Sequence, residues 1–444
     1  MELAHLRALE QDLPAKFSNW HVKNRAKLGL AAGEDLPEGT DGKTLKRLPI
    51  PTLPRGVETT INVSNQTELT AAINAAGPRK IVLQNNIICS SWNVIGGQHG
   101  NNAATTGRDV HIDGKGFALL NRGLNIEKGC NRILIENLAI YSGAATLVPG
   151  VTKSAINDPL TIVGMNAGKE PPKNITLRKC AFGFGGDMNV QIEGDRVWLD
   201  RCMSFHGLAN PNHPKHSSGP PHSKLYWVSA SNLVQNAGRR LRVMMTGCIG
   251  AFGEDRCPRV SGAVDFYAAD NWFCGCYLGA NIDDHHTSTG YLRATFEHNR
   301  FTTCQRVRSG AAGNTQPFSV FMGDQAAGRL RLSNNVIDGV PYDSPASAWD
   351  VIDHQYSFGG AYAGTETPVA NRSLNTVPVG AAYSPSADAK AYAIANAGAS
   401  TRDAIQQHVV SQMQLADAGH YTFTLLADED DLTVGGKAGW GILA

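Results

Sequence analysis

An eight-residue segment that recurs along the chain constrains its fold more than any other feature. The third residue of every copy is apolar, from Ile112 in the first copy to Leu332 in the last. Where no long loop intervenes, successive copies start about 22 to 28 residues apart, the length of one solenoid coil. The copies begin at Val110, Ile133, Ile175, Val197, Val243, Phe266, Ala294 and Leu330. The repeat predicts a parallel β-helix in which each copy supplies a strand of one coil.

The sixth residue of these copies follows a second pattern. It is cysteine in three successive copies and asparagine in the next three: Cys180, Cys202, Cys248, Asn271, Asn299 and Asn335. Coils of a β-helix stack about 4.8 Å apart, so a position meets the same position of the next coil. Asparagine amides can then hydrogen-bond from coil to coil, and small cysteines can stack inward. We expect both ladders.

A second set of strand-like segments alternates with the first. Its members begin at Asp158, Gly186, Lys224, Arg256 and Pro317. Each falls between successive copies of the first set, which gives at least two strands per coil and a long sheet along one face. The abundance of glycine, 47 residues, also favours an all-β chain with many turns.

The regions outside the repeat predict a three-part chain. Residues 1–60 are expected to be an N-terminal appendage and linker, and residues 61–340 the β-helix, capped by a helix over Ser64–Ala76 in which Asn65 and Glu68 form a capping box. Residues 341–444 are expected to be a C-terminal extension. It contains a helix over Ser400–Met413, with a second capping box of Ser400 and Asp403.

Composition excludes some classes of function. A net charge of +1 gives no global field that favours nucleic acid or membranes. No apolar run approaches the roughly 18 residues of a membrane span, and the N-terminus lacks the apolar core of a secretory signal. The nine cysteines lie between Cys89 and Cys304 without a zinc-like spacing, and we expect most to be packed thiols.

The stretch from Lys224 to Gly262 carries the candidate site. Lys224 opens one strand of the second set and Arg256 opens the next, so the two cations should project from neighbouring coils of one sheet. Such a pair on a rigid surface suits an extended anionic substrate. Trp227 follows on the same strand, where it can serve as a platform for a sugar ring.

At this point the chain resembles the pectate lyase family of polysaccharide lyases, which are right-handed parallel β-helix enzymes. The resemblance covers about residues 60–340. It is carried by VHIDGKGFALLNRGLNIEKGCNRILIENLAI, which is similar to the opening coils, and by LRVMMTGCIGAFGEDRCPRVSGAVDFYAADNWF, which resembles the Arg-x-Pro region. AGASTRDAIQQHVVSQM is similar to a C-terminal segment of some members.

The resemblance implies roles for particular residues. Arg256 matches the arginine that acts as Brønsted base, and Lys224 the lysine that contacts the substrate carboxylate one coil earlier. Arg259, Trp227 and His222 are expected to bind substrate. Asp158, Asp187 and Gln191 fall at the calcium-ligand positions, so calcium is the expected cofactor.

Two departures from the family pattern stand out. Gln191 and Ile156 occupy positions where the family has acidic residues, and Ser261 replaces the second arginine of the motif, although Arg259 lies nearby.

A second register against the family is also open. VWLDRC, with GDM ten residues before Trp198, resembles another family segment and would make Asp187 the first calcium ligand. We prefer the register that keeps one strand of each set per coil. Both registers retain Arg256 and Asp187.

These observations predict a lyase that cleaves an acidic, uronate-containing glycan such as pectate by β-elimination. The base removes a proton α to a carboxylate, and a cation must neutralise that carboxylate. The alternative is a non-catalytic glycan-binding or structural β-helix, such as a phage tail spike or fibre, which would be a homo-oligomer and typically a trimer. Either protein would act outside the cell, associated with a virion or secreted with a signal absent from this sequence.

Overall fold

The computed structural model describes the coils of the repeat and part of each terminal region. The described residues are 47–49, 51–56, 59–142, 158–163, 170–208, 224–230, 241–253, 257–276, 280–283, 293–304, 318–321, 329–333, 335–337, 340–342, 352–353, 377–379, 386 and 388–419. By its contacts the chain divides after Lys46, and everything below concerns the part that follows. The predicted domain boundaries stay predictions.

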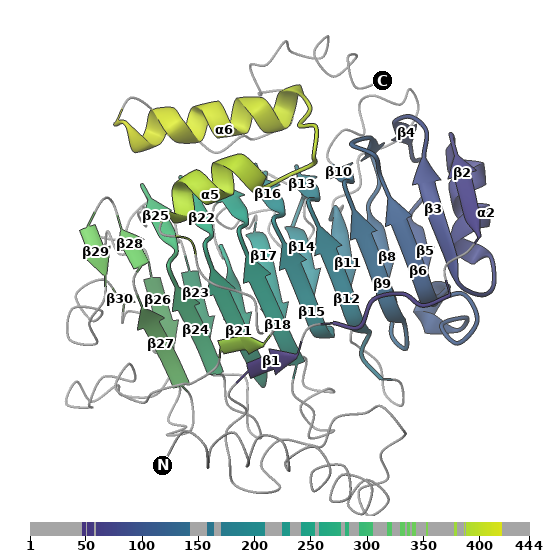
Figure 1. Cartoon of the computed structure of the whole chain (residues 1–444), viewed down its shortest axis with the longest axis horizontal. Coiled ribbons are helices and arrows are strands. Elements are labelled where there is room, and N and C mark those ends of the chain that lie inside the picture. Colours follow the sequence, from purple (N-terminus) through teal and green to yellow (C-terminus); the bar gives the residue numbers. More distant parts are fainter. Residues whose placement is uncertain are drawn as a thin grey trace, which may run out of the picture. The chain divides into compact units, whose positions relative to one another are not determined.

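Each coil contributes three strands, one to each of three long sheets (Figure 1). The first sheet contains the strands of the eight-residue repeat. Its members, in order, are β2 (Thr60–Val63), β3 (Arg79–Leu83), β6 (Arg108–Asp113), β9 (Asn131–Glu136), β12 (Lys173–Arg178), β15 (Asp195–Asp200), β18 (Leu241–Thr246), β21 (Val264–Ala269), β24 (Arg293–Glu297) and β27 (Arg329–Ser333).

The second sheet consists of short strands that follow the first sheet after a tight bend. Its members are β4 (Ile87–Ile88), β7 (Ala118–Leu120), β10 (Ala139–Tyr141), β13 (Ala181–Gly183), β16 (Met203–Phe205), β19 (Ile249–Ala251), β22 (Trp272–Cys274), β25 (Arg300–Thr302), β28 (Asn335–Ile337) and β29 (Val340–Tyr342).

The third sheet contains the segments predicted as the second set of strands. Its members are β5 (Asn93–Ile95), β8 (Leu124–Ile126), β11 (Leu160–Ile162), β14 (Met188–Ile192), β17 (Lys224–Ser229), β20 (Arg259–Ser261), β23 (Ala280–Asp283), β26 (Phe318–Phe321) and β30 (Ile352–Asp353). Apart from the antiparallel pair β28–β29, the three sheets pair in parallel. The predicted right-handed parallel β-helix is therefore confirmed, with three strands per coil.

The bend between the first and second sheets is made by one residue with left-handed backbone. In six coils this is the fifth residue of the repeat, with φ between 51° and 63°: Asn137, Lys179, Arg201, Gly247, Asp270 and His298. A non-glycine residue pays roughly 1 to 2 kcal/mol for this conformation. The hydrogen-bonded coils on either side hold it in place.

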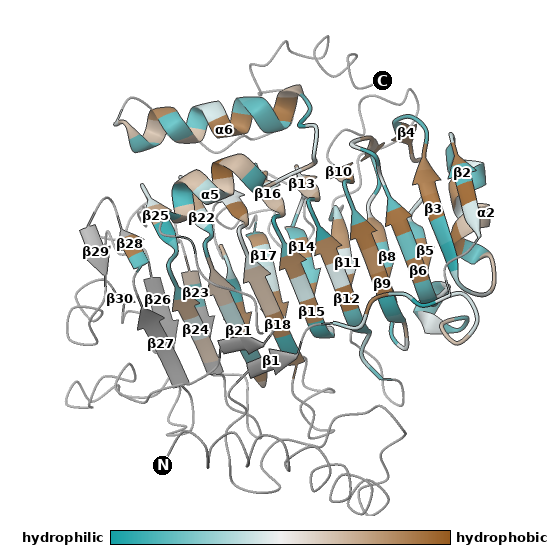
Figure 2. Cartoon of the chain, in the orientation of Figure 1, coloured by the Kyte–Doolittle hydropathy of each residue, from teal (hydrophilic) through white to brown (hydrophobic). Residues whose placement is uncertain are grey.

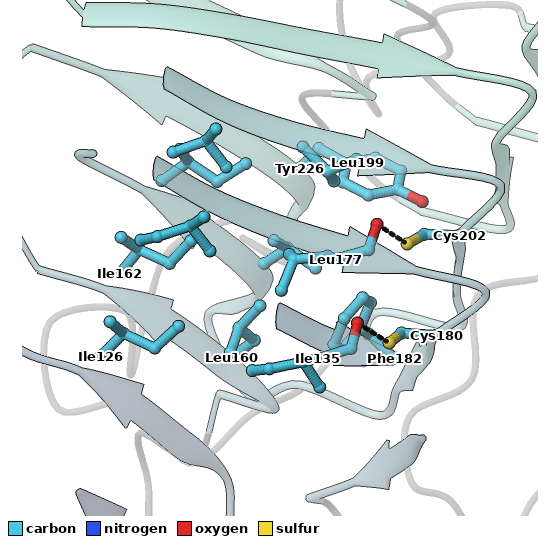
Figure 3. Packing of buried hydrophobic residues seen from close by; sticks show 14 of the residues in the cluster. Ile126, Ile135, Leu160, Ile162, Leu177, Cys180, Phe182, Leu199, Cys202 and Tyr226 are labelled. Carbon is cyan, nitrogen blue, oxygen red and sulfur yellow. Dashed lines mark hydrogen bonds between the residues drawn. The ribbon is translucent and has the colours of Figure 1, made fainter. Parts of the chain in front are cut away.

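The core lies between the sheets and is built from stacked copies of one position. The third residue of the repeat is at most 1% exposed in every copy from Ile112 to Phe296. Figure 3 shows Ile135, Leu177 and Leu199 one above another, facing residues of the third sheet such as Leu160 and Ile162. The apolar residues in Figure 2 follow the same strands from coil to coil.

The asparagine ladder is confirmed by its hydrogen bonds. Asn299 Oδ1 accepts from the backbone N–H of Asn271 at 3.1 Å and from Asn271 Nδ2 at 2.8 Å. Asn335 Oδ1 accepts in the same way from the backbone and side chain of Asn299, both at 3.0 Å. The Nδ2 groups of Asn271, Asn299 and Asn335 also donate to backbone carbonyls of the preceding coils. These bonds satisfy the polar groups that the bend buries.

The cysteine ladder is confirmed as well. All nine cysteines are free and buried. Cys180 Sγ donates to the Ile135 carbonyl and Cys202 Sγ to the Leu177 carbonyl, as Figure 3 shows. Burial raises the pKa of both thiols well above the ordinary value, so these groups are packed and unreactive.

The N-terminal end of the β-helix is covered by an α-helix, as predicted. Helix α2 (Gln66–Asn74) begins after the N-cap Asn65, whose side chain accepts from the Glu68 N–H. Glu68 returns a bond to the Ser64 N–H rather than to the N-cap residue itself. Leu69, Ala72 and Ile73 of this helix are buried in the core.

Two C-terminal helices, α5 (Ala389–Asn396) and α6 (Ala404–Asp417), lie beside the second sheet (Figure 1). The predicted capping box was wrong: Asp403 is the N-cap of α6, and its side chain accepts from the Gln406 N–H. Ser400 instead donates its hydroxyl to Asn137 on the β-helix. Helix α6 starts at Ala404, later than the predicted Ser400, because Ser400 contacts the β-helix and lies outside the α-helix.

Side-chain bonds attach α6 to the coils at both ends. Tyr141 donates its hydroxyl to Asp403 at 2.5 Å, and Arg300 Nη2 pairs with Asp417 at 2.5 Å. Two short strands that are distant from each other in the sequence, β1 (Arg47–Pro49) and β31 (Val377–Val379), pair in parallel. None of the described helices is both long and apolar enough to cross a membrane.

Candidate functional site

The third sheet presents one continuous outward column of partly exposed side chains. Its residues occupy the same register position on six successive strands, β8 to β23: Asn125, Thr161, Gln191, Trp227, Arg259 and Asn281. All six are intermediate in exposure, whereas neighbours along these strands such as Tyr226 and Val228 are buried. Alternation along the strands therefore separates a rigid polar surface from the core.

Trp227 and Arg259 are directly paired in this column. One supplies an aromatic face and the other a permanent positive charge. Trp227 Nε1 is buried and meets no hydrogen-bond acceptor among the described residues. The pair is held by two strands of a sheet, so its spacing is set by the backbone and not by loop conformation.

Lys224 lies at the start of β17, as predicted, but it does not project from the sheet. Its side chain is only 3% exposed, and Nζ donates to Asp187 Oδ1 at 2.5 Å. The Lys224 Nζ also lies 5.7 Å from the centroid of the Trp227 ring, within the range of a cation–π contact. A carboxylate from the preceding coil therefore holds this ammonium in the structure, and the expected contact between Lys224 and a substrate carboxylate stays a prediction.

Asp158 is buried one coil earlier. Its Oδ1 accepts the backbone N–H groups of Asp187 and Met188 at 3.3 and 2.8 Å. Burial, together with the nearby Asp187 charge, raises the pKa of Asp158 to about 7, although the Met188 N–H opposes this shift. Asp158 thus organises the turn that carries Asp187.

The three predicted calcium ligands do not form a calcium site within the described part of the chain. Calcium takes six to eight oxygen ligands. Here Asp187 Oδ1 holds an ammonium, Asp158 Oδ1 holds two backbone amides, and the Gln191 amide donates to Glu193 Oε1 at 3.0 Å. Across the described residues no group of three or more metal-binding side chains is found. Calcium stays a prediction.

Ser261, which stands where the family motif has its second arginine, is buried on β20. Its hydroxyl donates to the Ser229 hydroxyl on β17 at 3.1 Å. The cation nearest in the sequence, Arg259, lies two residues earlier on the same strand and therefore on the same face of the sheet.

Several predicted residues lie outside the described part of the chain. Arg256, His222 and Ile156 are among them, so their roles stay predictions. The preferred register agrees with the sheet order, because β11, β14, β17 and β20 are neighbours with one member per coil.

Three column residues were missed by sequence reasoning: Asn125, Thr161 and Asn281. A signal for Thr161 existed. Aligning LTI, VQI and YWV, the middle parts of segments already predicted as strands, places Thr161, Gln191 and Trp227 in one column. Asn125 and Asn281 lie on β8 and β23, which were not predicted.

Comparisons with known proteins find distant matches among solved structures. No protein-family model matches this chain, and no curated protein matches it at a significant level. Among solved structures, a pectate lyase from Xanthomonas campestris matches at 18% identity and a TM-score of 0.45, covering 78% of this chain and 96% of its own. A pectate lyase from Paenibacillus sp. matches at 14% and 0.46, with 78% and 91% covered.

A third structure is a pectate lyase from Bacillus sp. in complex with trigalacturonate, at 14% identity and a TM-score of 0.41, with 81% of this chain and 97% of that chain covered. These structures come from the family that the sequence resembles.

Proposed function

We propose that this protein is a polysaccharide lyase that cleaves an acidic, uronate-containing glycan by β-elimination. The observation that carries the proposal is the direct pairing of Trp227 with Arg259 on the outward face of the third sheet. A uronate residue offers an apolar ring face and a carboxylate, which match an aromatic side chain and a guanidinium. The column of amide and hydroxyl groups on either side suits the hydroxyls of neighbouring sugars.

The chemistry requires a base and a cation. The base removes the C5 proton, the electrons of that bond form the C4–C5 double bond, and the glycosidic C4–O bond breaks, leaving an oxygen that takes up a proton. Neutralising the carboxylate makes C5 more acidic and stabilises the enolate-like transition state. We assign carboxylate neutralisation to Arg259. Proton removal is assigned to the neutral form of Arg256, three residues before Arg259 in the sequence. Calcium enters no step, because the described donors do not fit it.

An absorbance assay for unsaturated uronate products tests the proposal, with polygalacturonate and bacterial capsule glycans as substrates. Arg259→Ala should lower kcat/KM by about 100-fold, the typical effect of losing one charge-stabilising donor. Arg256→Ala should abolish activity. Arg108→Ala, an exposed arginine of the first sheet, is the matched control and should keep full activity. Absence of product from every uronate polymer would refute the proposal.

A second candidate is a glycan-binding β-helix without catalysis. It is favoured by the length of the polar column, which spans six coils, compared with the few residues that β-elimination itself needs. Tight binding of an acidic glycan without release of unsaturated product would select it, and light scattering would show whether the protein is a trimer, as expected for a tail spike.

A further inference from the structure

Three ionisable groups from successive coils form a connected unit at the edge of the third sheet. Asp158 precedes β11, Asp187 precedes β14 and Lys224 begins β17. Asp158 Oδ1 accepts the Asp187 N–H at 3.3 Å, the Asp187 carbonyl accepts the Lys224 N–H at 3.0 Å, and Asp187 Oδ1 accepts from Lys224 Nζ at 2.5 Å. Each coil therefore positions the charge of the next.

Burial makes this unit depend on its internal pairing. Lys224 and Asp158 are 3% and 5% exposed as residues. A buried charge is costly unless a partner of opposite sign compensates it. The Trp227 ring, 5.7 Å from the ammonium, adds an electron-rich face beside it.

The ammonium and a divalent cation cannot share this place. A calcium ion bound to Asp187 would lie about 2.3 to 2.6 Å from its oxygens, and Lys224 Nζ already lies 2.5 Å from Oδ1. Two cations bound to one carboxylate oxygen at these distances would lie at most about 5 Å apart and would repel each other in a site of low dielectric. Either the lysine leaves, or calcium stays out.

We propose that the Lys224 ammonium takes the place of a divalent cation between these acidic residues, so that the site is assembled without calcium. With respect to activity, this inference rests on the proposed function. If the protein is a lyase, Lys224 orders the surface that carries Trp227 and Arg259 and does not touch the substrate carboxylate. Lys224 is a positioning residue.

The test measures calcium binding by the full chain without any substrate. Wild-type protein is titrated with calcium by calorimetry, and its Tm is compared in calcium and in EDTA. Terbium serves as a luminescent probe, excited through Trp227. Lys224→Met removes the ammonium but keeps most of the apolar stem. Asp187→Asn removes the carboxylate, and Lys173→Met is the control, because Lys173 forms a partly exposed pair with Glu170.

We expect wild-type and Lys173→Met proteins to show no calcium heat, no sensitised terbium emission and the same Tm in calcium and EDTA. Lys224→Met should have a lower Tm than wild type in EDTA, and adding calcium should raise that Tm again. The variant should also gain sensitised terbium emission, and the double variant Lys224→Met with Asp187→Asn should lose it. If Lys224→Met does not fold, the wild-type titration and the double variant decide.

Calcium binding by wild-type protein that Asp187→Asn abolishes would overturn the inference. So would a folded Lys224→Met variant that gains no response to calcium. These readouts are independent of catalysis: a protein inactive on every uronate polymer would refute the proposed function alone, whereas lyase activity that disappears in EDTA would refute this inference alone.

Discussion

Replacing Asn299 by alanine tests whether the asparagine ladder holds the coils together. The side chain is 1% exposed and makes four hydrogen bonds: it accepts from the N–H and Nδ2 of Asn271 and donates to the Ala268 carbonyl and Asn335 Oδ1. Alanine removes all four. The Asn271 N–H and the Ala268 carbonyl, both in buried residues, then lose these partners.

The magnitude follows from the number of bonds. At a net value of roughly 1 kcal/mol for each hydrogen bond, the loss is about 4 kcal/mol. Because unsatisfied buried groups cost more than the mean, the expected range is about 3 to 6 kcal/mol. That is a large share of the total free energy of unfolding of a typical folded protein, which is roughly 5 to 15 kcal/mol.

Urea unfolding followed by tryptophan fluorescence measures this loss. Asn85→Ala is the control: Asn85 is exposed, its side chain donates to the adjacent Asn86 carbonyl at 2.8 Å, and its loss should change the free energy of unfolding by less than about 0.5 kcal/mol. If Asn299→Ala lies within about 1 kcal/mol of that control, the ladder contributes little, and the reasoning from stacked coils is refuted.

Three further predictions concern stability and exposure. Burial, with a smaller effect of His408, lowers the pKa of His206 from 6.5 to about 3. Between these two pH values only the unfolded chain takes up the proton. The free energy of unfolding should therefore decrease as the pH is lowered from 6.5, by about 2 kcal/mol at pH 5. His206→Phe should remove this loss, and an unchanged pH dependence of urea unfolding would contradict the assignment. Asp417 pairs with Arg300 and Lys390, so Asp417→Asn should lower the free energy of unfolding by about 1.5 to 3 kcal/mol and speed proteolysis of α6. An unchanged digestion rate would contradict the idea that these ion pairs hold α6 against the coils. No cysteine of the native protein should react with Ellman's reagent and all nine should react in denaturant; a fast native thiol would contradict the packing.

The repeat made most of the fold predictable. One apolar position and one ladder position, such as Ile135 and Asn299, recur at coil spacing, and parallel stacking places like beside like. The second sheet was not separated from the first, because each eight-residue copy spans a bend made by a single left-handed residue such as Lys179. Such a bend leaves no glycine or proline signal in most coils.

The candidate site was predictable in position but not in pairing. The sequence places Trp227 and Arg259 on neighbouring strands of one sheet, and the sheet register agrees. It does not show that Asp187, 37 residues before Lys224, binds the ammonium at 2.5 Å.

The sequence by itself therefore determined the coil, the inward ladders and the strand that each candidate residue occupies, because these depend on periodicity alone. The tertiary structure alone decided which charges compensate one another. Asp158, Asp187 and Lys224 are separated along the chain by whole coils, and their interaction depends on stacking distance and burial. The sequence predicts Asp158 and Asp187 as calcium ligands and Lys224 as a substrate contact. In the folded chain, Lys224 and Asp187 form a partly buried ion pair, and Asp158 accepts the backbone N–H of Asp187.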